Sequence, residues 1–154
     1  MTPDLSLPAG YSIATGFERM DFQAVHACLT RSYWSPGVPR ATVERAAANS
    51  MCFGIFHQQE GQVAFARVVT DKTTFAYLAD VFVLEAHRGK GLSKCLVRAI
   101  QAHPELQGLR RLLLHTRDAH SLYSQLGFGP ITVPSRLMEI VQPVDDGAAH
   151  EQRT

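Results

Sequence analysis

The stretch at residues 81–93 constrains the fold most, because an apolar segment ends there, two glycines turn the chain, and a helix-like segment follows at once. The segment before the turn, residues 75–84, carries apolar side chains at both odd and even positions, with Asp80 as the exception. Strands that are buried on both faces have this pattern and lie in the middle of a sheet. We therefore predict a central strand with regular alternation, which places Tyr77 and Val81 on one face.

After the turn, apolar residues return at the spacing of a packed helix that begins at Leu92 and ends before Pro104. Elsewhere, runs rich in β-branched and aromatic residues indicate strands, and stretches rich in Gly and Pro indicate turns. Further strands are expected at residues 11–15, 51–57, 62–70 and 111–116, with a final pair at 128–131 and 136–141, and further helices at 22–29, 41–49 and 119–126.

The chain has 154 residues, which is enough for one domain with a proper core. We expect a single domain at residues 10–141, a flexible lead-in at 1–9 and a disordered tail at 142–154, because both ends have little to bury. The net charge of +1 gives no field that would attract nucleic acid or an anionic membrane. No signal peptide or membrane-spanning run is evident, and three widely spaced cysteines suit a reducing compartment, so we expect a cytoplasmic protein.

Two large aromatic residues, Tyr33 and Trp34, precede a stiff loop that two prolines and a glycine form at residues 35–39. Such rings either cover the edge of the core or line a pocket for a small molecule, since a constrained loop holds them in place. The sequence leaves both interpretations open. In the second, Tyr33 and Trp34 form a wall of the site that binds the acceptor substrate.

The turn itself, Arg88-Gly89-Lys90-Gly91-Leu92-Ser93, has the features of a phosphate site. Glycine lets the backbone approach a ligand closely, and the first N–H groups of a helix have no acceptor within the helix. The positive end of the helix dipole attracts an anion, and Arg88 and Lys90 add charge. Two nucleotide-binding motifs do not fit: Lys94 replaces the third glycine of Gly-x-Gly-x-x-Gly, and the spacing differs from that of a P-loop. A plain strand-to-helix connection is the alternative.

Two motifs together resemble a known family. Arg88-x-x-Gly91-x-Ser93 after an apolar strand resembles the Arg/Gln-x-x-Gly-x-Gly/Ala motif of the GNAT superfamily of N-acyltransferases. The segment Ala119-x-x-x-Tyr123-x-x-x-Gly127-Phe128 resembles that family's second motif, and the order of expected elements agrees over residues 11–141. The resemblance implies an α/β (α+β) fold: a twisted, mixed, mostly antiparallel sheet flanked by helices, with a splayed acetyl-CoA cleft between two central strands.

The same resemblance implies which residues hold acetyl-CoA. The pyrophosphate is expected on the backbone amides of Gly89, Lys90, Gly91, Leu92 and Ser93 with Arg88 beside them, and the pantetheine arm at the strand edge near Phe82 and Val83. Two positions depart from the usual pattern: Ser93 replaces Gly or Ala, and Thr116 replaces an Asn that contacts the cofactor arm in many relatives. The small hydroxyl of Ser93 can donate to a phosphate, and Thr116 can still form a hydrogen bond.

Acyl transfer from a thioester to an amine needs a neutral amine, a stabilised carbonyl oxygen and a proton for the leaving thiolate. Tyr123 matches the family's tyrosine, which lies near the CoA sulfur and can protonate it; the alternative is a tyrosine packed under the helix. Asp80 either binds the acceptor amine or relays its proton, or it forms a salt bridge with Arg67 or another basic residue. The family has no single invariant base, so none is carried over.

Other candidate groups carry less weight. His115 and His120 flank a strand-to-helix step without an obvious third ligand, so we expect no metal site. Cys52 and Cys95 would suit a covalent acyl-enzyme, but both stand in apolar contexts that are typical of core residues. Direct transfer in a ternary complex is therefore preferred.

We accordingly predict an N-acetyltransferase that transfers the acetyl group of acetyl-CoA to a primary amine of a small molecule or to an exposed amino group. A binding module of the same fold without catalysis, acting as an acyl-CoA sensor or assembly partner, is the alternative, and a plain structural domain is a third interpretation. Short sequence patterns do not name the acceptor. Exposed strand edges are consistent with a homodimer.

Overall fold

One five-stranded sheet organises the molecule, whose structure is a computed structural model that describes residues 6–143. The strands lie in the sheet in the same order as in the chain: β1 (Tyr11–Thr15), β2 (Met51–His57), β3 (Gly61–Thr70), β4 (Phe75–Val83) and β5 (Arg111–Leu114). The first four are antiparallel neighbours, and β5 pairs with β4 in parallel. The predicted fold class, a mixed and mostly antiparallel sheet flanked by helices, is confirmed.

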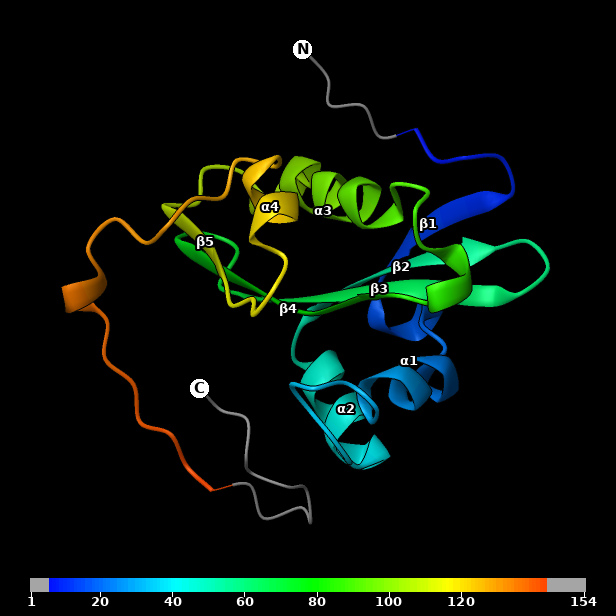
Figure 1. The fold of residues 1–154 in the computed structure, drawn as a ribbon, viewed down its shortest axis with the longest axis horizontal. Helices are drawn as coiled ribbons and strands as arrows, with labels where there is room; N and C mark the ends of the chain where they lie inside the picture. The colour runs from blue at the N-terminus through cyan, green and yellow to red at the C-terminus, as the bar shows by residue number, and fades with distance from the viewer. Residues whose placement is uncertain (1–5, 144–154) are drawn as a thin grey trace.

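Helices cover both faces of the sheet (Figure 1). On one face lie α1 (Phe22–Leu29) and α2 (Arg40–Ala48), and on the other lie α3 (Leu92–Ala102) and α4 (His120–Ser124). Short 3-10 turns lie at Phe17–Arg19, Glu85–His87, Pro104–Leu106 and Pro134–Arg136. No helix in residues 6–143 has the length and apolar character that spanning a membrane requires.

Each face of the sheet has its own hydrophobic core. The core under α3 is built from fully buried aliphatic residues of the helix and the central strands, among them Ile55, Val63, Leu96, Val97 and Ile100. The core under α1 and α2 contains Val25, Leu29, Cys52, Phe65 and Phe82. The central strands are thus buried on both faces, as their apolar pattern predicts.

A bulge interrupts β4 at Asp80. Phe65 of β3 lies opposite Phe82, but Arg67 lies opposite Ala79, so two residues of β4 face one residue of β3. Asp80 accommodates the extra residue with a φ of 57°, in the left-handed region that Asp adopts more readily than most residues.

Because of the bulge, the predicted alternation of side chains in β4 is wrong after Asp80. Val81 and Val83 pack into the core under α3 together with Ala76 and Leu78, and not on the face of Tyr77. The extra residue shifts the alternation by one position, so every side chain after Asp80 changes face relative to the prediction.

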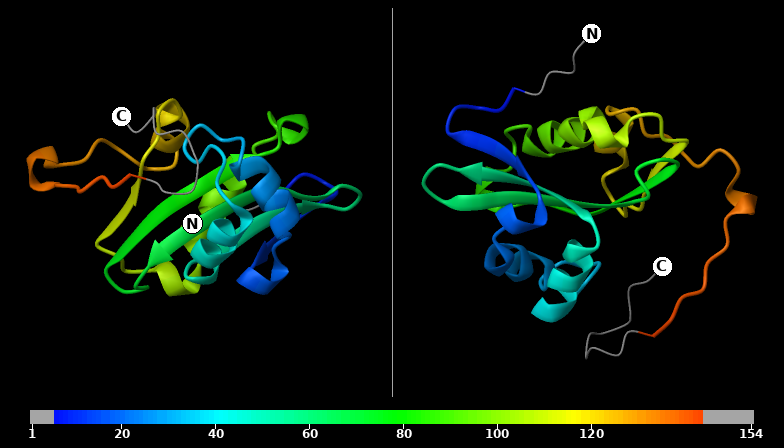
Figure 2. Two further views of the ribbon diagram at one scale, coloured as in Figure 1. Left: turned by 90° about the horizontal axis from the view of Figure 1, so that it is seen from below. Right: turned by 180° about the vertical axis from the view of Figure 1, so that it is seen from behind.

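The prediction of a pair of strands near the carboxyl end is wrong. Neither residues 128–131 nor residues 136–141 form a strand, and β5 ends at Leu114, two residues earlier than expected. Figures 1 and 2 show the segment after residue 132 extending away from the body of the molecule. A strand needs a neighbour to satisfy its backbone, and among residues 6–143 no strand pairs with this segment. Most of the predicted tail, residues 144–154, lies outside the described residues.

Candidate active site

The glycine turn leads from β4 into α3 with an open surface. Gly89 and Gly91 have φ values of 79° and 76°, and a Cβ built on either glycine would meet no atom within 4 Å. Gly91 is the N-cap of α3 and supplies no side-chain acceptor, so the first N–H groups of the helix stay available. The turn therefore has both the unfilled space and the unpaired donors that a phosphate group requires.

Two cations flank this turn. Arg88 and Lys90 are both exposed, and Arg88 is anchored because its Nε donates to the carbonyl oxygen of Val83 over 2.9 Å. The Arg88 guanidinium is thus held at the end of β4, and its other N–H groups can donate to a ligand.

The outer edge of β4 is open beside the turn. Pairing with β5 ends at Leu78 and Leu114, while β4 continues to Val83. The N–H of Leu84 donates to Val63 of β3 over 2.8 Å, so the backbone groups of the preceding residue, Val83, point the other way, toward the open edge. At this edge Val83 offers backbone groups to an extended ligand, whereas Phe82 lies opposite Phe65 and directs its backbone groups to β3. The Phe82 ring is buried in the core under α1.

Tyr123 lies in α4 with a buried ring and an accessible hydroxyl. The residue is 8% exposed, and its ring packs edge-on against Phe128 at 5.7 Å between centroids. In residues 6–143 no group hydrogen-bonds the Tyr123 hydroxyl, and no buried side-chain oxygen lacks a partner, so the hydroxyl reaches the surface. Burial, and secondarily the nearby Tyr33, raises the pKa of Tyr123. The phenol therefore keeps its proton and has no competing acceptor.

Thr116 lies at the start of the connection to α4. Its hydroxyl oxygen accepts a hydrogen bond from the backbone N–H of Ala119 over 3.0 Å. The side chain thus stabilises the turn that leads into α4, and its hydroxyl proton is still available to a ligand.

Asp80 is held by two side chains. Trp34 Nε1 donates to Oδ1 over 3.0 Å, and Arg67 Nε donates to Oδ2 over 2.8 Å. The Asp80 side chain is 14% exposed and that of Arg67 19%, and Arg67 also donates to Ser50 over 3.2 Å. The salt bridge that the sequence offered as one interpretation of Asp80 is therefore present, and the bulge turns the carboxylate toward the loop that carries Trp34.

Tyr33 ties the same loop to the segment after β5. The Arg117 guanidinium carbon lies 3.7 Å from the centroid of the Tyr33 ring, and the Tyr33 hydroxyl accepts from the Arg117 backbone N–H over 3.3 Å. The Tyr33 and Trp34 rings meet edge to face at 5.0 Å. Neither ring belongs to a core cluster, and Trp34 is 40% exposed, so both rings border the surface between β4 and the β5–α4 connection.

A hydrogen-bonded pair that sequence reasoning missed, Tyr77 and His115, stands beside this surface. The Tyr77 hydroxyl and His115 Nδ1 are 2.8 Å apart; Tyr77 lies in β4 opposite Leu113, and His115 directly follows β5. Burial first, and then the Asp80 carboxylate, raises the pKa of Tyr77. The two residues are far apart in sequence, and only the parallel pairing of β4 with β5 brings them together.

Comparison with known proteins decides the family. An acetyltransferase (GNAT) domain matches residues 49–130, which is more than half of the chain. The chain belongs to the GNAT family. A GNAT-family candidate acetyltransferase from Xanthomonas campestris pv. campestris is 46% identical, with a TM-score of 0.86 over 93% of this chain and 100% of that chain. A candidate acetyltransferase of Gibberella zeae is 27% identical over 75% of this chain and 76% of its own length.

A solved relative with a named substrate shares the fold alone. Glucosamine-6-phosphate N-acetyltransferase of Arabidopsis thaliana is 16% identical, with a TM-score of 0.60 over 88% of this chain and 99% of that chain. The GNAT match and the named relatives make this protein an acyltransferase enzyme.

Cys52 of this GNAT enzyme is a poor nucleophile. Cys52 is fully buried, its thiol donates to the carbonyl of Ala47 over 3.3 Å, and burial raises its pKa from 9.0 to about 11. Cys95 is half-buried, and its thiol donates to the carbonyl of Ser6 over 3.4 Å. The thiolate is the reactive form of cysteine, and a raised pKa leaves very little of it at neutral pH.

A Cys52→Ala variant should therefore keep the turnover of the parent enzyme within about twofold, because no step would pass through the thiol. Steady-state assays of CoA release measure this. A loss of turnover, together with a trapped acetyl-thioester on Cys52 in mass spectra of the parent, would contradict it.

Within residues 6–143, no three His, Cys, Asp or Glu side chains gather closely enough to hold a metal ion.

Proposed function

We propose that this GNAT enzyme transfers the acetyl group of acetyl-CoA to an amine, either a primary amine of a small molecule or an exposed amino group, by direct attack in a ternary complex. The observation that carries the proposal is the continuous run from the open edge of β4 to the uncapped start of α3. An extended ligand arm that ends in phosphates fits along this run. Backbone donors lie along the β4 edge, and the space beside Gly89 and Gly91 at the end of the run holds no other atoms.

The residues proposed to hold acetyl-CoA are those of the turn and the adjoining edge. The amides of Gly89, Lys90, Gly91, Leu92 and Ser93 would bind the pyrophosphate, with the charges of Arg88 and Lys90 beside it. The backbone of Val83 would bind the pantetheine arm beside Phe82, and the Thr116 hydroxyl would donate to it. When bound, acetyl-CoA supplies a thioester as the activated acyl donor.

Tyr123 is proposed as the general acid. Its hydroxyl is accessible and unpaired among residues 6–143, and its raised pKa keeps the proton on Oη near neutral pH. A proton held there can be given to a leaving thiolate. The direct attack of the amine makes a cysteine nucleophile unnecessary, in agreement with the buried thiol of Cys52.

The acceptor is proposed to bind between Tyr33, Trp34 and Asp80. Trp34 presents an exposed ring, and Asp80 keeps it in place through the hydrogen bond to the indole. Each carboxylate oxygen retains a further lone pair, so Asp80 can also attract a cationic amine directly or through water. Because Arg67 offsets its charge, Asp80 contributes orientation and binding more than basicity.

An Asp80→Asn substitution tests the structural part of this assignment. Asn tolerates the positive φ and keeps the contact with Trp34, but Arg67 loses its counter-charge in a largely buried position. We expect the free energy of unfolding to fall by about 1–3 kcal/mol, measured by denaturant titration, and the KM for the acceptor to rise. Glu44→Gln is the control, because the Arg40–Glu44 pair is 52% and 41% exposed and should contribute within about 0.5 kcal/mol. Equal effects of the two substitutions would remove the stabilising role from Asp80.

The proposed activity is tested by calorimetric titration with acetyl-CoA, followed by a screen of amines for thiol release. Saturable binding and acceptor-dependent release of CoA are the expected results. Binding without turnover across a broad amine panel would contradict the proposed transfer, and no binding would contradict the proposed donor. Three free thiols in the described chain suit a reducing compartment, so we propose that the enzyme works in the cytoplasm.

A further inference from the structure

The open edge of β4 determines where the thioester of acetyl-CoA would lie. The phosphates are proposed at the turn after Val83, and the pantetheine arm along the edge that precedes it. From Val83 back to Ala79 this edge has no partner in β5, which gives the arm roughly 17 Å of extended backbone. An arm that runs along it from the turn ends where β4 and β5 still pair, at Leu78 and Leu114. The reacting carbon would therefore lie beside the first residue after β5, which is His115.

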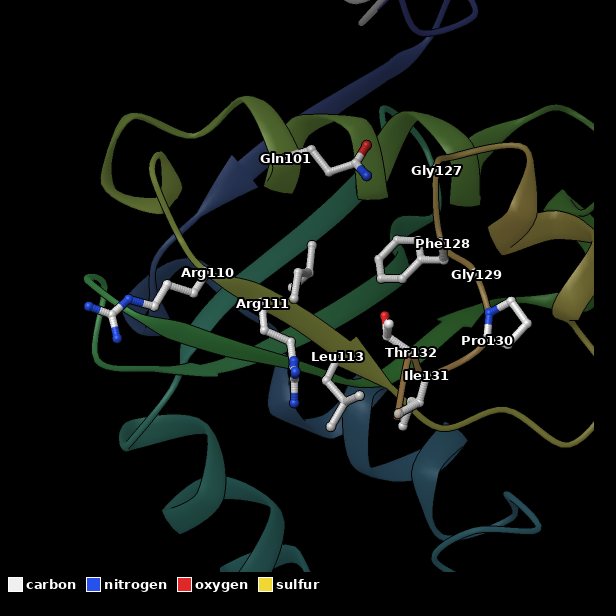
Figure 3. Close-up of a pocket in the computed structure, with 11 residues that line it drawn as sticks. Gln101, Arg110, Arg111, Leu113, Gly127, Phe128, Gly129, Pro130, Ile131 and Thr132 are labelled. Atoms are coloured by element: carbon white, nitrogen blue, oxygen red, sulfur yellow. The ribbon is translucent and has the colours of Figure 1, made fainter. Parts of the chain in front are cut away.

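The His115 side chain lies on the side of the sheet that faces away from α3. Side chains alternate between the two faces of a strand, and the two even-numbered residues of β5, both leucines, pack in the core under α3. Figure 3, a close-up of the hollow between β5 and residues 127–132, shows Arg111 and Leu113 pointing to the other side. His115 continues this alternation, and its hydrogen bond to Tyr77, which pairs with Leu113, places it on that side.

The same side of the sheet carries the carboxylate that is proposed to bind the acceptor. Arg67, which holds Asp80, follows two positions after Phe65, whose ring lies in the core under α1 and α2. Burial first, and then the nearby Asp80 carboxylate, raises the pKa of Tyr77, so this carboxylate also lies close to the phenol. Tyr77 is thus flanked by Asp80 and by His115. An amine between Asp80 and the proposed thioester would meet the His115 imidazole.

The His115 imidazole is held at one nitrogen and open at the other. Nδ1 lies 2.8 Å from the Tyr77 hydroxyl oxygen, and among residues 6–143 no group hydrogen-bonds Nε2. When Nδ1 carries the proton and donates it to the Tyr77 oxygen, Nε2 keeps a lone pair that can accept a proton. The raised pKa of Tyr77 keeps this phenol neutral, so it orients the ring without adding a charge. The imidazole is also exposed, which lets it return a proton to solvent.

The charged groups around this imidazole are less suited to accept a proton. Both Asp80 oxygens already accept hydrogen bonds, one from Trp34 and one from Arg67, and the guanidinium offsets the charge of the carboxylate. Arg67 and Arg117 keep their protons at any pH at which the protein is folded and have no acceptor atom. His115 is therefore the side chain of this surface with an available lone pair on nitrogen.

We propose that His115 is the general base for the acceptor amine and that Tyr77 positions its ring. The inference rests on the proposed acetyl transfer and names the group that makes the amine neutral. Nε2 takes one proton from the ammonium group, and the neutral amine forms the C–N bond to the acetyl carbon. The C–S bond breaks, and the thiolate takes a proton from Tyr123. The new amide nitrogen loses its extra proton, which restores the Tyr123 phenol, and His115 releases its proton to solvent.

Substitution of His115 by alanine tests the proposal through the rate of CoA release, with spermidine, free lysine, tyramine and glucosamine as acceptor probes. His115→Ala should lower kcat/KM for the amine by about 100-fold, as expected when a general base is lost, and leave acetyl-CoA affinity within about twofold. Added imidazole should restore at least about tenfold of the lost rate, because it can accept the proton in the vacated space. Tyr77→Phe keeps the ring but no longer orients His115, so it should lower kcat by about tenfold.

His103→Ala is the matched control. This residue follows α3 at the end remote from the glycine turn, and its Nδ1 accepts a hydrogen bond from the backbone N–H of Glu105 over 3.1 Å. The variant loses an imidazole with a structural contact only. It should keep kcat/KM within about twofold of the parent value, and imidazole should not change its rate.

A second measurement locates His115 without a variant. With a non-hydrolysable thioether analogue of acetyl-CoA bound, nuclear Overhauser effects should connect the terminal methyl group of the analogue to the ring protons of His115. Absence of these contacts would overturn the proposal, as would a His115→Ala variant with the parent kcat/KM or a loss of rate that imidazole does not restore. A parent enzyme that binds acetyl-CoA but releases no CoA with any of the four amines would instead contradict the proposed transfer, and the base with it.

Discussion

Substitution of Gly91 by glutamate is expected to lower the affinity for acetyl-CoA by at least about 100-fold, which corresponds to about 2.7 kcal/mol of binding free energy. Gly91 is the N-cap of α3, and a Cβ there points into space that no atom of the chain occupies. A glutamate would place a carboxylate in the space proposed for the pyrophosphate, where its bulk and its negative charge would oppose the phosphates at close range. Isothermal titration calorimetry with acetyl-CoA measures the loss.

The chain offers a matched control for this substitution. Gly108, before β5, has a φ of 72° and likewise no atom within 4 Å of a built Cβ. Gly108→Glu therefore introduces the same charge and a similar backbone strain of about 1 kcal/mol, but away from the start of α3. It should leave acetyl-CoA affinity unchanged. Equal losses in the two variants would trace the effect to backbone strain and would contradict the placement of the phosphates.

The features that sequence predicted well are those that local rules determine. The helix expected at residues 22–29 forms as α1, and Asp21 caps its start by accepting hydrogen bonds from the N–H groups of Gln23 and Ala24. Gly127 follows α4 with a φ of 96°, a conformation that suits the end of a helix. The turn into α3 belongs to the same class, because glycine spacing and helix polarity determine its geometry over a few residues.

The bulge at Asp80 shows where local rules stop. Residues 75–84 are apolar on both faces, so a shift by one position leaves the pattern unchanged and nothing in it reveals the extra residue. The bulge is determined by the register with β3, which moves from Phe65 opposite Phe82 to Arg67 opposite Ala79. Its one local trace is Asp80 itself, since Asp adopts a positive φ more readily than its apolar neighbours.

The acceptor side of the candidate site depends on contacts between distant parts of the chain. Tyr33 meets Arg117 across 84 positions, Trp34 meets Asp80 across 46, and Tyr77 meets His115 across 38. Sequence identified Tyr33, Trp34 and Asp80 one at a time, because each is unusual in its context. It could not show that they share a surface, because that requires the pairing of β4 with β5 and the path of the α1–α2 loop.

The carboxyl strands were mispredicted for a related reason. Residues 136–141 have the pattern of a strand, but a pattern does not say which edge a strand joins. Among the described residues, 6–143, no strand pairs with this segment.

Substitution of Tyr123 by phenylalanine should lower kcat by about 100-fold while changing acetyl-CoA affinity by less than about twofold, as expected when a general acid is lost. The buried ring and its contact with Phe128 remain, so the stability of the fold should change little. Because burial raises the pKa of Tyr123, its phenol stays protonated up to and beyond the usual tyrosine value of about 10. The kcat of the parent enzyme should therefore show no alkaline loss from this group below about pH 10.

Tyr11→Phe is the control for Tyr123→Phe, because it also removes a tyrosine hydroxyl but not one with a proposed chemical role. Tyr11 lies in β1, which β2 and β3 separate from β4, and its hydroxyl is 2.6 Å from Nδ1 of the buried His87. Tyr11→Phe should leave kcat within about twofold of the parent value, because its hydroxyl faces no reacting group. If Tyr123→Phe also kept the parent kcat and pH profile, Tyr123 would be a packing residue, and the proton for the leaving thiolate would have to come from solvent or from another side chain at the cleft.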